Sequence, residues 1–354
     1  MSKLEKAPTA FTFDDFNLAP VHSSVRSRKD PDVSVGIKNF NFNIPIISAP
    51  MNTITEADMV RAMHDLGGSS VLHRYMSIED QVKVSKELVI SGTLQSSSVN
   101  NFFAAVGANG DAIERTSALN SIGVKRFCID VANGHSDHCI EAVRSIRRNI
   151  PDAIIMAGNV CTYNGAIRLV EVGADAIRVG IGPGALCTTR LVTGHGVPQL
   201  TAIEDCAKIK QKYPNVCIIA DGGIRNSGDI VKALAIGADM VMVGSLLSGT
   251  SETPGPCIED PQTGLLYKNY FGMASEEGRS QWFGREQTAF VPEGAATKVA
   301  FKGDTDKVVE RLIGGLKVGM SYAGAFNLQE LRQNAQWYRI TGAGQIEGTP
   351  HGKI

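Results

Sequence analysis

The feature that most constrains the fold is a regular alternation of short apolar runs with stretches of helical periodicity, beginning near residue 45. Most of the runs are rich in β-branched residues, and several end in Gly, Asn or Asp, as buried parallel strands do. The runs that we predict to be strands are residues 44–47, 70–73, 96–99, 126–131, 153–157, 176–179, 217–220 and 240–243. Residues 166–175 and 228–239 have helical spacing, and the tripeptide GAD ends each of these helices.

Eight strand–helix units over about 200 residues suit a (β/α)8 barrel, an α/β fold, better than an open doubly wound sheet. A doubly wound sheet would carry a GxGxxG phosphate turn after its first strand, and the sequence has none there. The nearest match, at Gly342 and Gly344, has the wrong following spacing and opens no βαβ unit. We therefore predict a TIM barrel.

Two segments lie outside the repeat. Residues 1–43 form an N-terminal arm, and residues 250–303 are rich in Gly, Pro and Glu with weak periodicity. So long a stretch after the last strand is more often an active-site lid than a surface excursion, so we predict a C-terminal flap over the active site. A disordered surface loop is the alternative. We find no internal domain boundary and predict one catalytic domain over residues 1–354.

Charge and cysteine content exclude several classes of protein. The 35 basic and 36 acidic residues leave a formal net charge of −1, so no global field favours nucleic acid or an anionic membrane. The apolar runs are shorter than the roughly 18 residues of a membrane span, and the N-terminus lacks the apolar core of a secretory signal. Seven cysteines without a CxxC pair argue against a disulfide framework and a structural zinc site. We expect a soluble, cytoplasmic protein.

Chemistry in a barrel collects at the carboxyl ends of the strands. The predicted strands seven and eight are followed by Gly222 and Gly223, and by Gly244 and Ser245. Backbone N–H groups at such residues can approach a phosphate because no bulky side chain blocks them. Asp221, just ahead of the first pair, can hold two ribose hydroxyls with one carboxylate. The alternative is that these glycines only turn strand into helix.

The most informative stretch is GIGPGALCTTR at residues 180–190. Three glycines and a proline at a strand end predict a tight backbone arch, and Cys187 follows it directly. A loop thiol among backbone N–H groups, with Arg190 nearby, is a candidate nucleophile with a depressed pKa. The other six cysteines lie mostly in apolar or helical contexts and are predicted to be small core residues.

Neither a protease nor a divalent-metal enzyme is favoured. A cysteine protease needs a histidine base, and His195 is the only histidine near Cys187 in the sequence. The seven histidines show no HxH or HExxH spacing. Backbone carbonyls of the arch, at Gly182, Gly184 and Cys187, are instead candidates to hold a monovalent cation.

Five motifs, GIGPGALCTTR, DGGIR, VGS, NYFGMAS and VPEG, occur in this order along the chain. Together they closely resemble the IMP dehydrogenase/GMP reductase family. The resemblance implies that Cys187 attacks C2 of a purine nucleotide to form a covalent thioimidate, and that a nicotinamide exchanges hydride with C2. GMP reductase expels ammonia from GMP and reduces the intermediate with NADPH to give IMP. IMP dehydrogenase passes hydride to NAD and hydrolyses the intermediate to XMP.

Three features resemble the reductase. The run CTTRLVTGHGVPQLTAI is similar to the reductase loop after the cysteine, and the flap has reductase-like length without an Arg-Tyr dipeptide. The large regulatory (CBS-type) insertion that dehydrogenases usually carry after the second strand is missing. In contrast, SAPMNTITEADMV, VPEG, GGLKVGMSYAGA and ITGAG read more like bacterial dehydrogenases. We predict NADPH-dependent reductive deamination of GMP, with an IMP dehydrogenase that uses NAD as the alternative.

The chain departs from the reductase pattern at four positions. Phe290 and Pro292 stand where the reductase has an Arg and a Ser that recognise the guanine amino group. Ala185 replaces a Ser that helps to hold phosphate, and Arg74 replaces a Lys that helps to hold the cofactor. These departures permit a deoxy or otherwise modified GMP as the substrate.

The resemblance implies a role for each candidate residue. Cys187 is the nucleophile, while Thr189 and Glu293 relay the proton that makes ammonia a competent leaving group. The substrate-binding candidates are Asp221, Gly222, Gly223, Gly244, Ser245, Gly272, Met273 and Gly294. The cofactor-binding candidates are Ser27, Arg28, Arg74, Asp130, Ala132, Asn133 and Gly182.

The resemblance further implies K+ at Gly182, Gly184 and Cys187, and a homotetramer. Two other classes stay open beside it. A nucleotide sensor would keep the phosphate turns without a reactive thiol, and an FMN-dependent barrel oxidase would share the phosphate grip of strands seven and eight.

Overall fold

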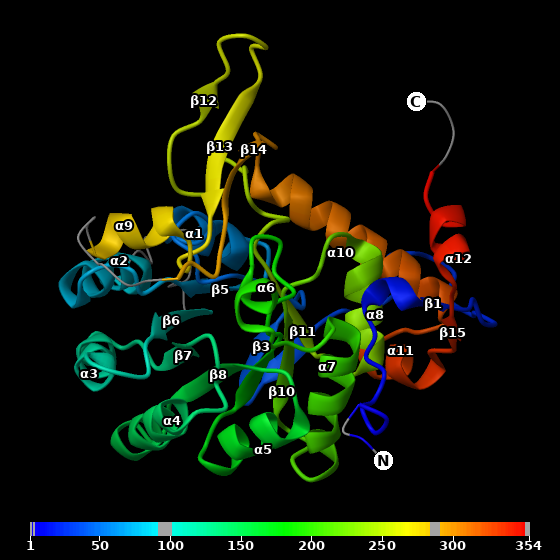
Figure 1. Ribbon diagram of the computed structural model, residues 1–354, viewed down its shortest axis with the longest axis horizontal. Helices are drawn as coiled ribbons and strands as arrows, with labels where there is room; N and C mark the ends of the chain where they lie inside the picture. The colour runs from blue at the N-terminus through cyan, green and yellow to red at the C-terminus, as the bar shows by residue number, and fades with distance from the viewer. Residues whose placement is uncertain (1, 3, 91–100, 284–290, 351–354) are drawn as a thin grey trace.

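The computed structural model describes residues 2, 4–90, 101–283 and 291–350. Its centre is a closed barrel of eight strands, which follow one another around the ring in the order β10-β11-β4-β5-β6-β7-β8-β9 (Figure 1). All neighbouring pairs in the barrel are parallel. The strands are β4 (Ile46–Ser48), β5 (Ser69–Leu72), β6 (Phe102–Val106), β7 (Arg126–Asp130), β8 (Ile154–Val160), β9 (Ala176–Val179), β10 (Cys217–Asp221) and β11 (Met240–Val243). The predicted (β/α)8 barrel is therefore confirmed.

The prediction for the third strand is wrong. Residues 96–99 were expected to form it, but they lie outside the described residues, and the third barrel strand is β6. All five residues of β6 are buried and their sequence is FFAAV. An entirely apolar run of this kind suits a strand that is covered on both faces, so it is the better candidate on physical grounds.

Helices form the outer ring around the barrel (Figure 1). They are α1 (Ala57–Asp65), α2 (Ile78–Ile90), α3 (Ala112–Ser121), α4 (Asp137–Asn149), α5 (Tyr163–Glu171), α7 (Gln199–Ala207), α8 (Ser227–Ile236) and α10 (Thr305–Tyr322), with a 3-10 turn, η2 (Lys208–Gln211), after α7. The short helix α6 (Thr189–Thr193) has no buried residue and belongs to the loop that follows β9. Asn226 caps the N-terminus of α8 by accepting the N–H of Asp229. Gly237, with φ of 133°, ends α8 in a conformation that side chains rarely adopt, as the GAD pattern predicted.

The inside of the barrel is a packed apolar core. Phe103, Cys128, Met156 and Ile219 belong to one buried cluster with side chains of the N-terminal arm. The arm contributes Ile37 and Phe42 from a hairpin of β2 (Val35–Ile37) and β3 (Phe40–Phe42). The cluster includes the first residues of β9, β10 and β11, so the hairpin covers the amino-terminal end of the barrel. The opposite end is left for chemistry.

The rest of the arm packs against the C-terminal part of the chain. A 3-10 turn, η1 (Phe13–Asp15), precedes β1 (Phe16–Leu18), which pairs with β15 (Trp337–Arg339) in an antiparallel ribbon. The remaining C-terminal helices are α11 (Leu328–Asn334) and α12 (Gly342–Glu347). No helix in the described ranges is long and apolar enough to cross a membrane.

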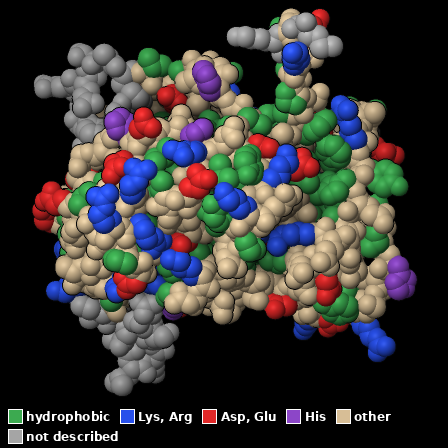
Figure 2. Space-filling view, turned by 90° about the horizontal axis from the view of Figure 1, so that it is seen from below, with side chains coloured by type: hydrophobic (Ala, Val, Ile, Leu, Met, Phe, Trp, Pro, Cys, Tyr) green, Lys and Arg blue, Asp and Glu red, His purple; other side chains and the backbone are tan. Residues whose placement is uncertain are grey.

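The two ends of the segment 250–303 lie next to each other at the barrel. Thr250 and Gly303 form an isolated parallel bridge. Between them, a sheet of β12 (Ile258–Glu259), β13 (Leu266–Phe271) and β14 (Ala296–Ala300) stands out from the barrel (Figure 1), and α9 (Glu276–Phe283) lies between β13 and β14 in the sequence. On the face shown in Figure 2, basic and acidic side chains are interspersed, in keeping with the net charge of −1.

Candidate active site

A cavity of about 540 Å³, here called the central cavity, lies at the carboxyl ends of the barrel strands beneath the segment 250–303. Its wall combines residues at the ends of six strands, β4, β5, β7, β8, β9 and β10, with residues from that segment. The predicted site residues that line it are Arg74, Asp130, Ala132, Gly182, Gly184, Cys187, Thr189, Asp221, Gly272, Met273, Glu293 and Gly294. The barrel thus gathers most of the candidates into one volume.

Cys187 is exposed and is linked to an acid through a hydroxyl group. Its thiol donates to Thr189 Oγ1 over 3.2 Å, and the Thr189 hydroxyl donates to Glu293 Oε2 over 2.8 Å. Glu293 is 104 residues beyond Thr189 in the sequence, so this line of three groups exists only in the folded chain. It connects a nucleophile to a carboxylate by two proton-carrying steps.

Backbone pairing holds the acid beside the nucleophile. Cys187 and Gly294 form an antiparallel bridge, Thr188 N–H donates to the Glu293 carbonyl over 2.9 Å, and Ala295 N–H donates to the Leu186 carbonyl over 2.9 Å. A Cβ at Gly294 would lie 3.2 Å from the backbone nitrogen of Ser275, so the close approach favours glycine. The predicted flap therefore contacts the predicted nucleophile through its backbone.

Arg190 does not lie where the sequence suggested. Its Nε donates to the Ile181 carbonyl over 3.1 Å, and its NH2 group donates to the Val197 carbonyl over 2.6 Å. A Cβ at Gly182 would lie only 2.4 Å from Arg190 Cγ. Arg190 therefore holds the backbone of the arch through these carbonyls. These hydrogen bonds do not involve Cys187, so the expected effect of Arg190 on the Cys187 thiol stays a prediction.

The sequence reasoning missed Arg178, which lies in β9 and is almost completely buried. Its guanidinium donates to Asp130 Oδ1 over 2.8 Å and to Asp221 Oδ2 over 2.8 and 3.2 Å. Burial opposes the charge, but the two neighbouring carboxylates outweigh it and hold the pKa of Arg178 well above its usual value. Arg178 is thus a permanent cation that joins the two acids of the cavity.

Asp221 is held rigidly by these contacts. Asn159, also missed, donates to Asp221 Oδ2 over 2.8 Å and to the Gly180 carbonyl over 2.9 Å. All of these donors use Oδ2, and among the described residues no side chain donates to Oδ1. One carboxylate oxygen therefore stays open for hydroxyl groups of a ligand.

None of the four residues of the predicted glycine turns lines the central cavity, and phosphate binding by Gly222, Gly223, Gly244 and Ser245 stays a prediction. Gly222 and Gly223 have φ values of 86° and 78°, in the left-handed region that glycine favours. A Cβ at Gly222 would lie 3.1 Å from the backbone nitrogen of Gly184, so this turn packs directly on the arch. Gly244 and Ser245 follow the neighbouring strand β11, and Lys302 Nζ donates to the Ser245 carbonyl over 3.0 Å.

Arg74 lies at the opposite wall of the cavity. Its Nε is 3.8 Å from Asp130 Oδ2, and its guanidinium carbon is 4.8 Å from the centre of the Tyr75 ring. The Nε–H is buried and has no hydrogen-bond acceptor in the described part of the chain. A cation with a spare buried donor fits an anionic group of a nucleotide cofactor.

Several predicted residues lie elsewhere. Ser27 and Arg28 are exposed in the arm, where Val21 N–H donates to the Tyr322 carbonyl and Asp32 N–H donates to the Phe326 carbonyl, so this stretch runs along α10 and not into the cavity. Asn133 is exposed next to Ala132, and its Oδ1 accepts the His135 N–H. The position of Phe290 lies outside the described residues, and Pro292 is exposed.

The site as a whole suits covalent chemistry on a nucleotide. A thiol, a hydroxyl and a carboxylate meet below the backbone of the segment 250–303, while the carboxylate of Asp221 lies on the barrel side of the cavity. Within the described ranges, no group of three or more His, Cys, Asp or Glu residues could hold a metal ion.

Comparison with known proteins places this site in context. A family model for the IMP dehydrogenase / GMP reductase domain matches residues 10–351. The inosine-5′-monophosphate dehydrogenase of Borreliella burgdorferi is 36% identical, with 97% of this chain and 96% of that protein covered. The enzyme of the same name from Bacillus subtilis is 35% identical, with 96% and 95% covered, over an alignment of 467 positions.

A solved structure is similar over the whole chain. It is a cysteine-to-alanine variant of GMP reductase from Trypanosoma brucei in complex with guanosine 5′-monophosphate. The two chains superpose with a TM-score of 0.92 at 28% identity, and 100% of each chain is covered. The fold is therefore shared from end to end.

Proposed function

Because the chain belongs to the IMP dehydrogenase/GMP reductase family, we propose that it catalyses the NADPH-dependent reductive deamination of GMP, or of a deoxy or modified GMP, to IMP and ammonia. The observation that carries this proposal is the hydrogen-bonded line from Cys187 through Thr189 to Glu293. Expelling an amine requires a proton donor beside the nucleophile, and this line of groups supplies one. The dehydrogenase reaction would need in addition a base that activates water. Bound guanosine 5′-monophosphate in the similar solved structure supports the substrate class.

In the first half of the reaction, the Cys187 sulfur attacks C2 of the purine, and the bond from C2 to the amino nitrogen breaks. The thiol proton travels along Thr189 and Glu293 to that nitrogen, so the leaving group is neutral ammonia and the product is a thioimidate on Cys187. In the second half, the cofactor, when bound, supplies the hydride that reduces C2. The carbon–sulfur bond then breaks, IMP leaves, and a proton restores the thiol.

The remaining candidates hold the two nucleotides. In this proposal Asp221 binds the ribose through Oδ1, and Gly222, Gly223, Gly244 and Ser245 bind the phosphate through backbone N–H groups. Gly272, Met273 and Gly294 line the cavity where the base would lie. Asp130 and Ala132 line the nicotinamide side together with Arg74, and the spare donor of Arg74 supports an anionic cofactor.

Four further assignments stay part of the proposal. K+ would be held by the carbonyls of Gly182, Gly184 and Cys187. The Gly184 carbonyl already accepts the Cys187 N–H over 3.0 Å, which leaves it one lone pair for a cation. Ser27, Arg28 and Asn133 would complete the cofactor site of a homotetramer, in which the arm of one subunit reaches the site of another. A single catalytic domain in the cytoplasm completes the proposal.

The second candidate is an IMP dehydrogenase that passes hydride from IMP to NAD and forms XMP. The names of the curated relatives favour it, since those described above are inosine-5′-monophosphate dehydrogenases. Pro292, in place of a Ser that reads the guanine amino group, favours it as well. The two candidates differ in whether the thioimidate meets hydride or water.

The deciding experiment follows nicotinamide absorbance in two mixtures, GMP with NADPH and IMP with NAD and K+. Consumption of NADPH with release of ammonia supports the reductase, and formation of XMP in the second mixture overturns it in favour of the dehydrogenase.

Cys187→Ala should abolish turnover while nucleotide binding persists. Glu293→Gln should slow deamination much more than the exchange of hydride between IMP and NADP; equal losses would make Glu293 structural.

A further inference from the structure

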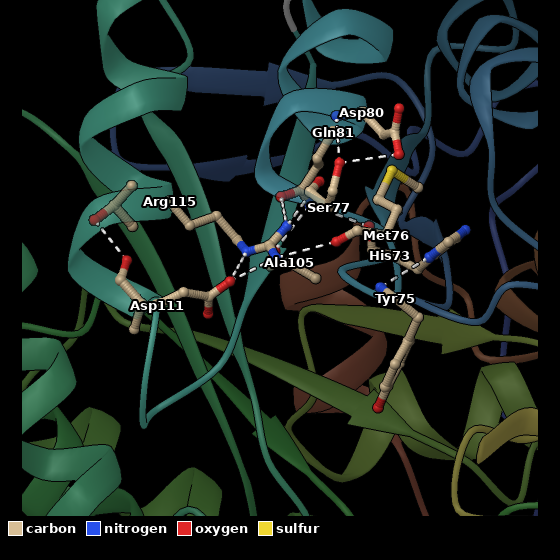
Figure 3. Close-up of polar contacts among 11 residues, drawn as sticks. His73, Tyr75, Met76, Ser77, Asp80, Gln81, Ala105, Asp111 and Arg115 are labelled. Atoms are coloured by element: carbon tan, nitrogen blue, oxygen red, sulfur yellow. Dashed lines mark hydrogen bonds and ion pairs between the residues drawn. The ribbon is translucent and has the colours of Figure 1, made fainter. Parts of the chain in front are cut away.

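A second polar cluster lies outside the central cavity, between α2, α3 and the loop of residues 73–77 that joins β5 to α2 (Figure 3). Its centre is Arg115 on α3, whose side chain is only 4% exposed. Asp111, one turn earlier, accepts from Arg115 Nε over 2.9 Å and from NH2 over 2.6 Å. This ion pair balances the charge of Arg115 but leaves some of its N–H donors for other partners.

The remaining donors of Arg115 point across to the loop. NH2 donates to the Met76 carbonyl over 3.1 Å, and NH1 donates to the Ser77 carbonyl over 3.4 Å and to Gln81 Oε1 over 2.9 Å. Gln81 is fully buried, and its Nε2 donates to the His73 carbonyl over 3.1 Å and to the Ala105 carbonyl over 2.9 Å. The two side chains therefore tie three carbonyls of the loop to α3 and β6.

The residues between these tied carbonyls are the ones that face the ligand. Arg74 and Tyr75 lie between His73 and Met76, and both line the central cavity. A Cβ at Gly107, just after β6, would lie 3.6 Å from Arg74 NH1, so the Arg74 guanidinium lies against this glycine. Any shift of the loop relative to β6 would move the Arg74 donors within the cavity.

We propose that Arg115, together with Gln81, is a positioning pair that fixes Arg74 for the nicotinamide dinucleotide. This inference rests on the proposed function insofar as Arg74 binds the cofactor. Neither Arg115 nor Gln81 lines the central cavity, so they act through the loop and not by contact with the ligand. Of the five hydrogen bonds of Arg115, two go to Asp111 and three go to the loop and to Gln81, so this one guanidinium joins α3 to the loop that carries Arg74.

The test compares Arg115→Met with Arg126→Met. Arg126 is also buried, but it begins β7 at the opposite end of the barrel, where it donates to the Phe102 carbonyl over 3.1 Å and covers the Phe40 ring. We expect Arg115→Met to raise the Kd of NADPH about tenfold and to leave the Kd of GMP within about twofold, as measured by titration calorimetry. Arg126→Met should lower Tm without changing either Kd.

A double-mutant cycle separates positioning from general destabilisation. Arg74→Ala alone should weaken NADPH, and adding Arg115→Met in that background should weaken it no further, because Arg115 acts through Arg74. Additive losses, or equal losses of NADPH affinity in Arg115→Met and Arg126→Met, would overturn the proposal.

Arg115→Lys replaces Arg115→Met if the latter does not fold. It keeps the ion pair with Asp111 but lacks the planar guanidinium that donates to the loop, so the same loss of NADPH affinity is expected. If the unsubstituted protein binds GMP but neither NADPH nor NAD, the proposed function fails, and Arg115 is then not a cofactor-positioning residue.

Discussion

At the scale of single residues, the chemistry depends on a hydroxyl between a thiol and a carboxylate. Thr189 accepts from Cys187 and donates to Glu293, so its hydroxyl makes both hydrogen bonds of the line at once. Thr189→Val keeps the shape and removes this capacity. We expect kcat for deamination to fall about 10²–10³-fold while the Kd of GMP is unchanged.

Thr189→Ser is the matched control for Thr189→Val, since it keeps the hydroxyl and loses only a methyl group. Its kcat should stay within a few-fold of the unsubstituted protein, as steady-state assays with GMP and NADPH would measure. A Thr189→Val enzyme with normal kcat would show that the proton takes another route.

Residue exposure also predicts which thiols react. Cys187 and Cys257 are exposed, whereas Cys128, Cys139 and Cys206 are buried. Iodoacetamide should therefore alkylate the two exposed cysteines of the native protein and leave the buried ones intact, as peptide mass spectrometry would detect. GMP should protect Cys187 and not Cys257, which serves as the internal control. Equal protection of both would argue against nucleotide binding at the central cavity.

At the scale of elements, a buried lysine ties the sheet β12–β13–β14 to the start of the segment 250–303. Lys268 on β13 donates to the carbonyls of Thr250 and Ser251 over 3.0 and 3.2 Å. Burial lowers the pKa of Lys268, but these carbonyls solvate the cation. Lys268→Met leaves the carbonyls without their donor, so we expect this sheet to lose about 1–3 kcal/mol of local stability.

Hydrogen exchange measures the loss in Lys268→Met directly. Protection should fall in β13 and β14 and should persist in the barrel strands, because the bonds of Lys268 join only this sheet to residues 250–253. Lys298→Met on the neighbouring strand β14 is the control, since Lys298 is exposed and, among the residues that the structure describes, donates to the Tyr267 hydroxyl alone. Uniform loss of protection across the barrel would contradict a local tether.

How far the sequence predicts the structure differs from element to element. Apolar runs and glycine stops identified seven of the eight barrel strands, because buried parallel strands are apolar on both faces. The third strand was misplaced because residues 96–99, SSSV, contain a single apolar residue, whereas the sequence FFAAV of β6 is apolar throughout. Arg178 was missed because it lies inside the otherwise apolar run of β9, which predicts a strand and says nothing about a site. A buried charge in a barrel strand must nevertheless have partners, and this requirement was the available signal. The pairing of Gly294 with Cys187 depends on tertiary structure alone.

At the scale of the whole molecule, buried thiols predict how stability depends on pH. Burial raises the pKa of Cys128 and Cys139 to about 12, whereas an unfolded thiol ionises near about 8.5. Above that value the unfolded chain holds fewer protons than the native one, so the free energy of unfolding falls as pH rises. The fall is up to about 1.4 kcal/mol per pH unit for each thiol.

Urea unfolding between about pH 8 and pH 10 measures this slope. Burial lowers the pKa of Arg126 to about 10, which acts in the opposite direction only above that pH. Cys139→Ala should flatten the slope by the share of one thiol, and Cys257→Ala, at an exposed position, should leave it unchanged. A stability that rises over this range would contradict the assignment of neutral buried thiols.

The bridge between Thr250 and Gly303 has a consequence for how such a barrel changes over time. An excursion that starts and ends at one point behaves as a cassette: it can lengthen, shorten or be exchanged while the strands beneath it stay in register. Here the cassette carries Glu293, whereas the barrel carries Cys187. The nucleophile is thus inherited with the scaffold and the acid with the replaceable part, so two reactions can share one barrel and differ in what has been inserted at a single position.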